Sequence, residues 1–473
     1  MSTRRPSSCS RCQKLQQENR ELFERVGNLE QALQQLREQL AKEQKNSSTS
    51  AKPPSSDIVK PPKPLRDPNQ PKRLIGGQPG HPAHFRAPFS AEQVTNTVPH
   101  QLHCCPDCGQ TLEATAEPPR IVQQMDLDEI CFTIEEHHSH TSWCPHCQKV
   151  YAAPLPARIE QGGLLGPQLT ALVAYLKGAC HASYSTIRKF FRDVLQVPIS
   201  RGYLAKVIAK VSSALDQSYE ELLRLLPSAA ILNIDETGHK FKGDRWWTWC
   251  FRAELYVLYH VDAHRSGDVL MELLGKDFKG VIGCDYFSSY RRYMRECGVT
   301  LQFCLAHLIR DVKFVTTLPR PAERAYGERL RTLLRELFAI IHQRAQWSAQ
   351  AFRQHLEAKR QEILAAGLQA VPDSKHCQAL ANRFRKHGAA YFEFITTPGI
   401  EPTNNLAEQA IRFVVIDRYI TQGTRSESGN RWCERIWTVI ATCALQGKSV
   451  YEFLTASVTA YWAGTKPPSL VPE

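Results

Sequence analysis

The stretch Ile231-Leu-Asn-Ile-Asp-Glu-Thr237 decides the fold, because an apolar run of strand length ends there on a carboxylate. A second run, Val281-Ile-Gly-Cys-Asp-Tyr286, repeats the pattern with Asp285 in the place of Asp235. Apolar strands of this kind are typical of parallel pairs, whose carboxyl ends meet at one edge of a sheet and bind ligands there. We therefore expect neighbouring parallel strands to bring Asp235 and Asp285 to one edge.

The surrounding sequence predicts the rest of a mixed sheet. Strand-like runs occupy residues 230–235, 246–251, 256–261, 280–285 and 300–304. Three successive strands followed by strands that alternate with helices indicate a mixed α/β sheet with flanking helices. Residues 319–387 have helical apolar spacing, which predicts a compact helical insertion before the last part of the domain.

A third carboxylate follows this insertion, in Thr403-Asn-Asn-Leu-Ala-Glu-Gln-Ala-Ile-Arg412. Thr403 or Asn404 can cap a helix that carries Glu408 and packs on the sheet. Convergent carboxylates suit Mg²⁺ or Mn²⁺, which prefer oxygen ligands and leave coordination positions for phosphate. Each acid taken alone would be read as a solvated carboxylate. Glu236 and His239 follow the first acid closely, could face solvent and stay outside the predicted ligand set.

Composition restricts the partner and the compartment. The 473 residues include 59 Lys and Arg against 47 Asp and Glu, a formal net charge of +12 that favours an anionic partner. The amino-terminal residues lack the apolar segment of a signal peptide, and no apolar stretch is long enough to span a membrane. We expect a multidomain, cytoplasmic protein whose paired cysteines, among 16 in total, bind metal rather than form disulfides.

The amino-terminal region, residues 1–45, has a heptad pattern. Leucines recur every seven residues, and a second seam position falls four residues after each of them. Asn19 occupies one of these second seam positions, the heptad position called a, where a polar residue fixes the register and the oligomeric state of a coiled coil. A parallel coiled-coil dimer is the first interpretation, and a single amphipathic helix on the protein's own surface is the alternative.

Residues 46–88 are rich in Pro, Ser and basic residues, which predicts an extended linker or an arm that follows phosphates.

Residues 89–160 contain two cysteine pairs, Cys105-Pro-Asp-Cys108 and Cys144-Pro-His-Cys147. Each short turn can present two thiolates, and four thiolates suit tetrahedral Zn²⁺. A full set of four sulfur ligands leaves no open coordination position, so the predicted zinc ribbon is structural rather than catalytic. The alternative is four unligated thiols.

Residues 161–228 are predicted to be helical and to resemble a helix-turn-helix. A helix from about Ser183 is followed by a second that Ser200 can cap. Arg201, Tyr203 and Lys206 would then reach DNA. Packing of an ordinary helical subdomain is the alternative interpretation.

An ordered series of motifs makes the chain resemble a transposase of the insertion sequence 66 family. The series comprises the linker of residues 46–57, Gly76-Gly-Gln-Pro-Gly-His81, the two cysteine pairs, Asp235-Glu-Thr237, Arg265-Ser-Gly267, Gly280 to Asp285, Cys304-Leu-Ala-His307 and Asn404 to Arg412. The resemblance implies a ribonuclease H-like core of the DDE type, formed by residues 229–318 and 391–473 and interrupted by a helical insertion at 319–390.

Residue by residue, the resemblance implies that Asp235, Asp285 and Glu408 are the metal ligands. His307 would be an active-site neighbour, or else a histidine that packs and bonds at a strand-to-helix junction. Arg412, one helical turn beyond Glu408, would contact a phosphate or form a surface ion pair. The chain departs from the family at Asp417-Arg-Tyr419, where a basic run is common, and at Leu308-Ile-Arg310, where a pair of arginines is usual.

The resemblance also implies a function. The protein would bind the ends of an insertion sequence, cleave a phosphodiester with Mg²⁺ and transfer the strand to target DNA, as a homodimer or higher oligomer with companions encoded by the same element. Two alternatives share the sequence features: a catalytically inactive or domesticated DNA-binding regulator, and a ribonuclease H-like nuclease without strand transfer.

Overall fold

The computed structural model describes residues 10–45, 49, 88–94, 97–98, 107–108, 110, 121, 123 and 132–472. The chain divides into two units, one formed by Pro62–His138 and the other by Met1–Pro61 with Ser139–Glu473. In the first unit, the short helix η2 (Ala91–Gln93) follows Phe89, whose backbone amide and carbonyl both bond the side chain of Gln123.

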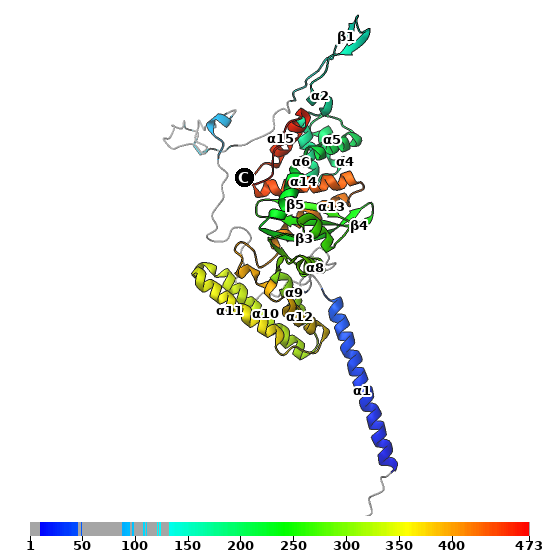
Figure 1. Cartoon of the computed structure of the whole chain (residues 1–473), viewed down its shortest axis with the longest axis vertical. Helices are drawn as coiled ribbons and strands as arrows, with labels where there is room; N and C mark the ends of the chain where they lie inside the picture. Colours follow the sequence, from blue (N-terminus) through cyan, green and yellow to red (C-terminus); the bar gives the residue numbers. More distant parts are fainter. Residues whose placement is uncertain are drawn as a thin grey trace, which may run out of the picture. The chain divides into compact units, whose positions relative to one another are not determined.

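The amino-terminal heptads form one long helix, α1 (Ser10–Glu43) (Figure 1). Its seam leucines are exposed: Leu22 keeps 54% and Leu29 68% of its accessible surface. The predicted helix is therefore present, and the predicted coiled coil stays a prediction. The second cysteine pair lies at the turn of a hairpin made of β1 (Thr141–Cys144) and β2 (Lys149–Ala152), with Cys144 paired to Lys149.

A five-stranded mixed sheet forms the centre of the larger unit, as the sequence predicts. Its strand order is β5-β4-β3-β6-β7, antiparallel on the β5-β4-β3 side and parallel from β3 to β7. The strands are β3 (Ile231–Phe241), β4 (Asp244–Arg252), β5 (Val257–Asp262), β6 (Val281–Cys284) and β7 (Thr300–Phe303). Lys242 and Gly243, both with positive φ, form the two-residue turn between β3 and β4.

The predicted end of the first strand at Asp235 is wrong, because β3 continues to Phe241 and pairs along that length with β4. Polar residues from Glu236 to Lys240 hide this extension in the sequence. Asp235 nevertheless lies where the parallel part of the sheet stops, since its neighbour β6 ends at Cys284.

One group of helices comes before the sheet in sequence, and it packs against helices that come after the sheet. The earlier group is α2 (Ala157–Gly162), α3 (Pro167–Gly178), α4 (Tyr184–Asp193), α5 (Arg201–Ala214), α6 (Asp216–Leu225) and η3 (Leu226–Ser228). It packs against the closing helices α14 (Glu427–Leu445) and α15 (Val450–Ala463) (Figure 1). Contact is close, because a Cβ at Gly178 would lie 2.4 Å from Ile436 Cγ1. Ser200 caps α5 as predicted, accepting from the Tyr203 amide at 3.1 Å.

The remaining helices flank the parallel strands and form the insertion. α7 (Gly267–Leu274), α8 (Ser288–Cys297) and α9 (Leu305–Val315) alternate with β5, β6 and β7. The insertion consists of α10 (Pro321–His342), η4 (Arg344–Gln346), α11 (Ala349–Leu368) and α12 (Lys375–His387). The short helices η5 (Ala389–Tyr391) and η6 (Glu393–Ile395) follow it and contact β7. α10 packs on both α9 and α11, and α13 (Asn405–Thr421) then packs on β3 and β4. No described helix is both long and apolar enough to cross a membrane.

The outer edge of β5 is covered by α14. Three side chains one turn apart on the helix accept from alternate strand amides: Thr442 Oγ1 from Val257 at 3.1 Å, Thr438 Oγ1 from Tyr259 at 3.1 Å and Glu434 Oε1 from Val261 at 2.8 Å. Four residues of a helix rise about 6 Å, and two residues of a strand rise about 7 Å. Every fourth residue of α14 therefore lies opposite every second residue of β5 over this length. The helix thereby satisfies amides that an edge strand would otherwise leave unpaired.

Candidate active site

Asp235 lies on β3, and Asp285 comes directly after the neighbouring parallel strand β6. Asn233 of β3 pairs with Gly283 of β6, and each aspartate comes two residues later on its own chain segment. Side chains two residues apart share a face of a sheet, so the register directs both carboxylates to the same side. Both residues are partly exposed. The structure thus brings these two predicted acids together at the expected place.

The third acid is brought to the sheet by Asn404. This residue occupies the N-cap position of α13, as predicted, but its side chain makes no capping bond. Instead its Nδ2 donates to the carbonyl of Ile234 at 2.8 Å, and its Oδ1 accepts from Asn233 Nδ2 at 3.1 Å. Asn404 is buried, so these bonds fix the start of α13 against β3, one turn before Glu408. A Cβ at Gly283 would lie 2.5 Å from Asn233 Nδ2, which explains the glycine there.

The three carboxylates interact electrostatically. Burial raises the pKa of Asp235 well above its ordinary value, and the charges of Glu236, Asp285 and Glu408 raise it further. A hydrogen bond from the Glu236 amide opposes this rise. Neighbouring carboxylates in a poorly solvated place resist simultaneous ionisation unless a cation joins them. The donor set and its excess negative charge therefore fit a divalent cation with oxygen ligands.

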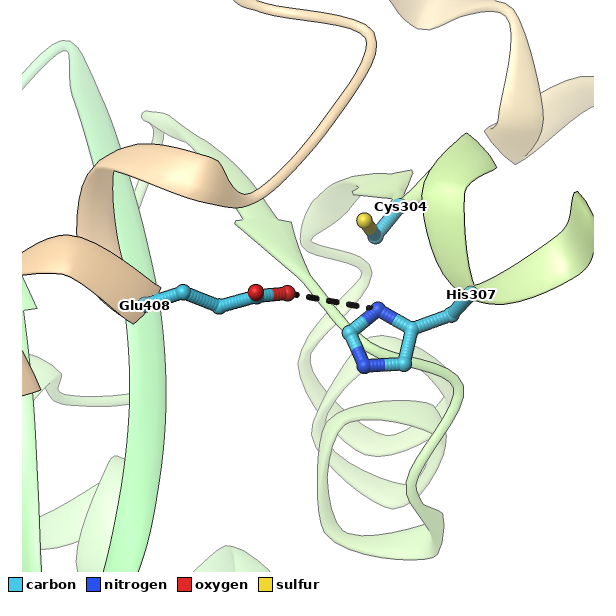
Figure 2. Close-up of side chains that lie close together, drawn as sticks. All are labelled: Cys304, His307 and Glu408. Atoms are coloured by element: carbon cyan, nitrogen blue, oxygen red, sulfur yellow. Dashed lines mark ion pairs between the residues drawn. The ribbon is translucent and has the colours of Figure 1, made fainter. Parts of the chain in front are cut away.

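Glu408 also faces a cysteine and a histidine at the start of α9 (Figure 2). Its Oε1 lies 3.7 Å from His307 Nδ1, and its Oε2 lies 3.8 Å from Arg310 Nη2. Cys304, His307 and Glu408 have donor atoms all within 4.8 Å of one another, a closeness that no other trio of such side chains shares among the described residues. His307 is therefore a neighbour of Glu408, and the structure supplies a partner for the CxxH motif that the sequence did not reveal.

The imidazole of His307 favours its neutral form. Burial lowers the pKa of His307 and the positive charge of Arg310 lowers it further, while Glu408 and Asp285 oppose the change. The Nδ1 of His307 and the Oε1 of Glu408 are buried atoms for which the structure shows no hydrogen-bond partner. Arg310, the last residue of the segment Leu308-Ile-Arg310, lies beside the same glutamate.

Glu236 and His239 are buried, so the expectation that either could face solvent is wrong for both. Glu236 accepts from Arg265 Nε at 2.6 Å and from the Tyr290 hydroxyl at 2.5 Å. Burial raises the pKa of Glu236, and the Asp285 charge adds to it. His239 bonds Thr424 at 2.9 Å, and burial lowers the pKa of this histidine to about 4.

The motif Arg265-Ser-Gly267 thereby acquires a structural meaning. The Arg265 guanidinium lies 3.8 Å from the ring centre of Phe287, and the Arg265 carbonyl accepts from Ser289 Oγ at 3.0 Å. Both partners follow Asp285 closely in sequence, so Arg265 connects the loop after the second acid to the glutamate next to the first. This arginine was the available sequence signal for a buried acid at Glu236.

The departure at Asp417 is also structural. Asp417 is buried on α13, where its carboxylate lies 3.3 Å from His181 Nδ1 and accepts from Trp437 Nε1 at 3.2 Å. Arg418 donates to Thr237 Oγ1 at 3.1 Å and to the carbonyl of Gly238. These contacts attach the carboxyl-terminal half of α13 to β3, α14 and the loop after α3. They hold the helix that carries Glu408.

The predicted DNA-contacting residues have different surroundings. Arg201 and Lys206 are exposed on α5, and Arg201 Nη2 donates to Ser185 Oγ at 2.5 Å. Tyr203 is partly buried, and its hydroxyl accepts from the Leu165 amide at 3.0 Å. Arg412 is exposed on α13. Exposure leaves the three basic residues open to a phosphate backbone, whereas Tyr203 serves the packing of α5.

Two of the predicted zinc ligands can be located. Cys108 and Cys147 are exposed, whereas Cys105 and the side chain of Cys144 lie outside the described residues. The zinc ribbon therefore stays a prediction.

Comparisons with known proteins agree with the motifs. The model of the transposase IS66 family matches residues 162–431, and a family of unknown function matches residues 3–87. The uncharacterized protein y4jD of Sinorhizobium fredii is 25% identical over 343 residues, covering 66% of this chain and 66% of that protein. A second uncharacterized protein of the same organism, y4qI, is 23% identical over 358 residues, covering 68% of this chain and 65% of that protein. The chain thus spans about two thirds of the length of these relatives.

Proposed function

Because the chain belongs to the transposase IS66 family, we propose that it binds the ends of an insertion sequence and catalyses metal-dependent phosphodiester cleavage and strand transfer. The observation that carries this proposal is that three carboxylates from distant segments lie near the end of the parallel strands, although among the described residues only Cys304, His307 and Glu408 bring their donor atoms within 4.8 Å of one another. Asp235 on β3 and Asp285, the residue directly after β6, each come two residues beyond the paired residues Asn233 and Gly283, and Asn404 fixes the helix that bears Glu408 against β3.

Asp235, Asp285 and Glu408 are the residues that would hold Mg²⁺ or Mn²⁺. When bound, the metal supplies charge stabilisation for the oxygens that enter and leave the phosphorus in an in-line displacement. The chain's own residues position the carboxylates: Asn404 orients α13, and Arg265 holds the loop after Asp285. His307, with a neutral imidazole, is proposed as a neighbour that touches the DNA or its attacking water.

The net positive charge supports DNA as the partner. In this proposal Arg201, Lys206 and Arg412 contact phosphates, α1 pairs with a second copy of the chain, and Cys105, Cys108, Cys144 and Cys147 hold a structural Zn²⁺. Holding two element ends together would require at least two copies. Companion proteins encoded by the same element belong to the same proposal.

The test is cleavage of DNA that contains the terminal repeats flanking the coding region. Wild-type protein with Mg²⁺ or Mn²⁺ should nick the repeat end and join it to target DNA. Asp235→Asn and Glu408→Gln should each lose cleavage and still shift the repeat DNA in a gel, because an amide is a neutral, poorer metal ligand.

A matched control is Glu272→Gln, which makes the same change at an exposed position of α7 and should cut normally. Undiminished cutting by Asp235→Asn would contradict the proposal. Repeat binding without cleavage by the wild type would favour the regulator, and nicks without joined products would favour the nuclease.

A further inference from the structure

The three donor atoms at the start of α9 have the chemistry and spacing of a transition-metal site. A thiol, an imidazole and a carboxylate converge there from two elements, since Cys304 and His307 come from α9 and its cap, and Glu408 from α13 (Figure 2). Tetrahedral zinc with ligands at 2.0–2.3 Å places donor atoms about 3.3–3.7 Å apart. The 3.7 Å between His307 Nδ1 and Glu408 Oε1 lies at the upper end of that range, so a small shift of either side chain brings both atoms to zinc distance.

The two atoms that face each other lack other partners. Both His307 Nδ1 and Glu408 Oε1 are buried, and the described residues offer neither a hydrogen bond. A buried polar atom left without a partner is costly, so two such atoms that face each other are suited to share a ligand placed between them. Arg310, the nearby cation, faces the other oxygen of Glu408 at 3.8 Å. It therefore leaves the Oε1 side open to a metal.

The surroundings of Cys304 can stabilise its thiolate form. Its Sγ accepts from the backbone amide of Asn404 at 3.2 Å. Burial raises the pKa of the Cys304 thiol, and hydrogen bonds from the amides of Asn404, His307 and Ala306 oppose that rise. These donors lie at the amino ends of α13 and α9, where helix dipoles also favour negative charge. A metal that displaces the thiol proton to solvent would leave a thiolate already supplied with donors.

We propose that Cys304, His307 and Glu408 form a binding site for Zn²⁺, distinct from the Mg²⁺ site and sharing Glu408 with it. Sulfur and imidazole select zinc over magnesium, which prefers oxygen ligands only. Three protein ligands leave the fourth position of zinc for water. A Glu408 carboxylate held by zinc is withdrawn from Asp235 and Asp285, so zinc inhibits cleavage. The proposal thus has a binding half, that these residues bind zinc, and an inhibitory half, that the bound zinc inhibits cleavage. The inhibitory half rests on the proposed function, whereas the binding half does not.

The binding half is tested by metal content of the full chain. Purified protein is stripped of metal, titrated with Zn²⁺ and compared with Cys304→Ser and His307→Asn, with folding checked by circular dichroism. Each variant should bind one zinc equivalent fewer than the wild type, and any zinc held by the predicted zinc ribbon would be common to all of them. Cys180→Ser is the control, because Cys180 is exposed and outside the cluster, and it should bind as the wild type does.

Co²⁺ gives a second readout in the same proteins. The wild type should gain a thiolate charge-transfer absorption from this site that Cys304→Ser lacks. Equal zinc content in the wild type and in both folded variants would overturn the proposal. Should Cys304→Ser fail to fold, His307→Asn alone decides, since it leaves the sulfur and its amide donors in place.

The inhibitory half is tested by adding Zn²⁺ to the Mg²⁺-dependent cleavage reaction, with each protein compared to its own zinc-free rate. The zinc concentration that halves the rate should rise about tenfold or more in Cys304→Ser, because losing a ligand weakens the site at least as much as losing a supporting contact. An unchanged zinc sensitivity would refute inhibition through this site. If no protein cleaves DNA, the proposed function fails, and the zinc content still decides the binding half.

Discussion

At the scale of single residues, Asn404 connects the third carboxylate to the first. It is buried, and both polar atoms of its side chain form hydrogen bonds with residues of β3. Asn404→Ala should destabilise the fold by about 1–3 kcal/mol, because the carbonyl of Ile234 and the amide of Asn233 lose their partner. It should also reduce cleavage, since Glu408 loses its fixed start. Chemical denaturation and the cleavage assay measure the two effects.

Asn405 offers the matched control for Asn404. It is the first residue of α13 and is exposed, so Asn405→Ala should change stability by less than about 0.5 kcal/mol. If both alanine variants behave alike, Asn404 has no special part in holding α13.

Asp235 makes stability depend on pH in a defined direction. Its pKa is raised in the folded chain, so its contribution to stability is full below the ordinary aspartate pKa and is lost as pH rises through the raised value. Metal-free protein should therefore lose stability as pH rises above about 4. Added Mg²⁺ should restore stability most strongly at the high-pH end, where Asp235 is ionised and can bind it.

Asp235→Asn tests this assignment, because it removes the titrating group. The variant should melt a few degrees higher than the wild type in metal-free buffer near pH 8, and Mg²⁺ should stabilise it less. Thermal melts with and without Mg²⁺ across pH decide the matter. If the melting temperature of Asp235→Asn depends on pH as strongly as that of the wild type, the raised pKa of Asp235 is contradicted.

At the scale of elements, the edge of β5 depends on side chains of α14. Thr438→Val keeps the shape of the side chain and removes the acceptor for the buried amide of Tyr259. We expect a loss of about 1–3 kcal/mol in the free energy of unfolding. Thr459→Val makes the same change at an exposed position of α15 and should cost less than about 0.5 kcal/mol. Similar losses from both would show that the edge contact contributes little.

The heptads of α1 make the second prediction at this scale. If the exposed leucines pair with another copy, Leu22→Asp with Leu29→Asp should convert a dimer to a monomer in light scattering. Gln31→Asp, a polar position away from the seam, should leave the mass unchanged. A monomeric wild type at micromolar concentration would instead favour the single amphipathic helix.

At the scale of the whole molecule, the sequence predicted what depends on local periodicity. All five strands, their mixed arrangement and the helical insertion follow from apolar spacing, and the neighbouring register of Asp235 and Asp285 follows from the parallel pairing of two similar runs. The resemblance to a family added the roles of the acids. Both kinds of inference use residues that lie close together in sequence.

The rest depends on contacts between distant segments. Glu236 is buried because Arg265 and Tyr290 meet it across the fold, and neither adjoins it in sequence. The side chain of Asn404 has two possible sets of partners, its own helix or β3, and only packing selects the strand. The nearness of Glu408 to His307 depends in the same way on how α9 and α13 are placed.

The most direct measurement of the central claim is the anomalous diffraction of Mn²⁺ in crystals of the protein with its terminal-repeat DNA. We expect Mn²⁺ peaks in contact with carboxylate oxygens of Asp235, Asp285 and Glu408, next to the phosphate to be cleaved. Mn²⁺ bound elsewhere, or a Glu408 carboxylate out of reach of the ion that the two aspartates hold, would contradict the claim.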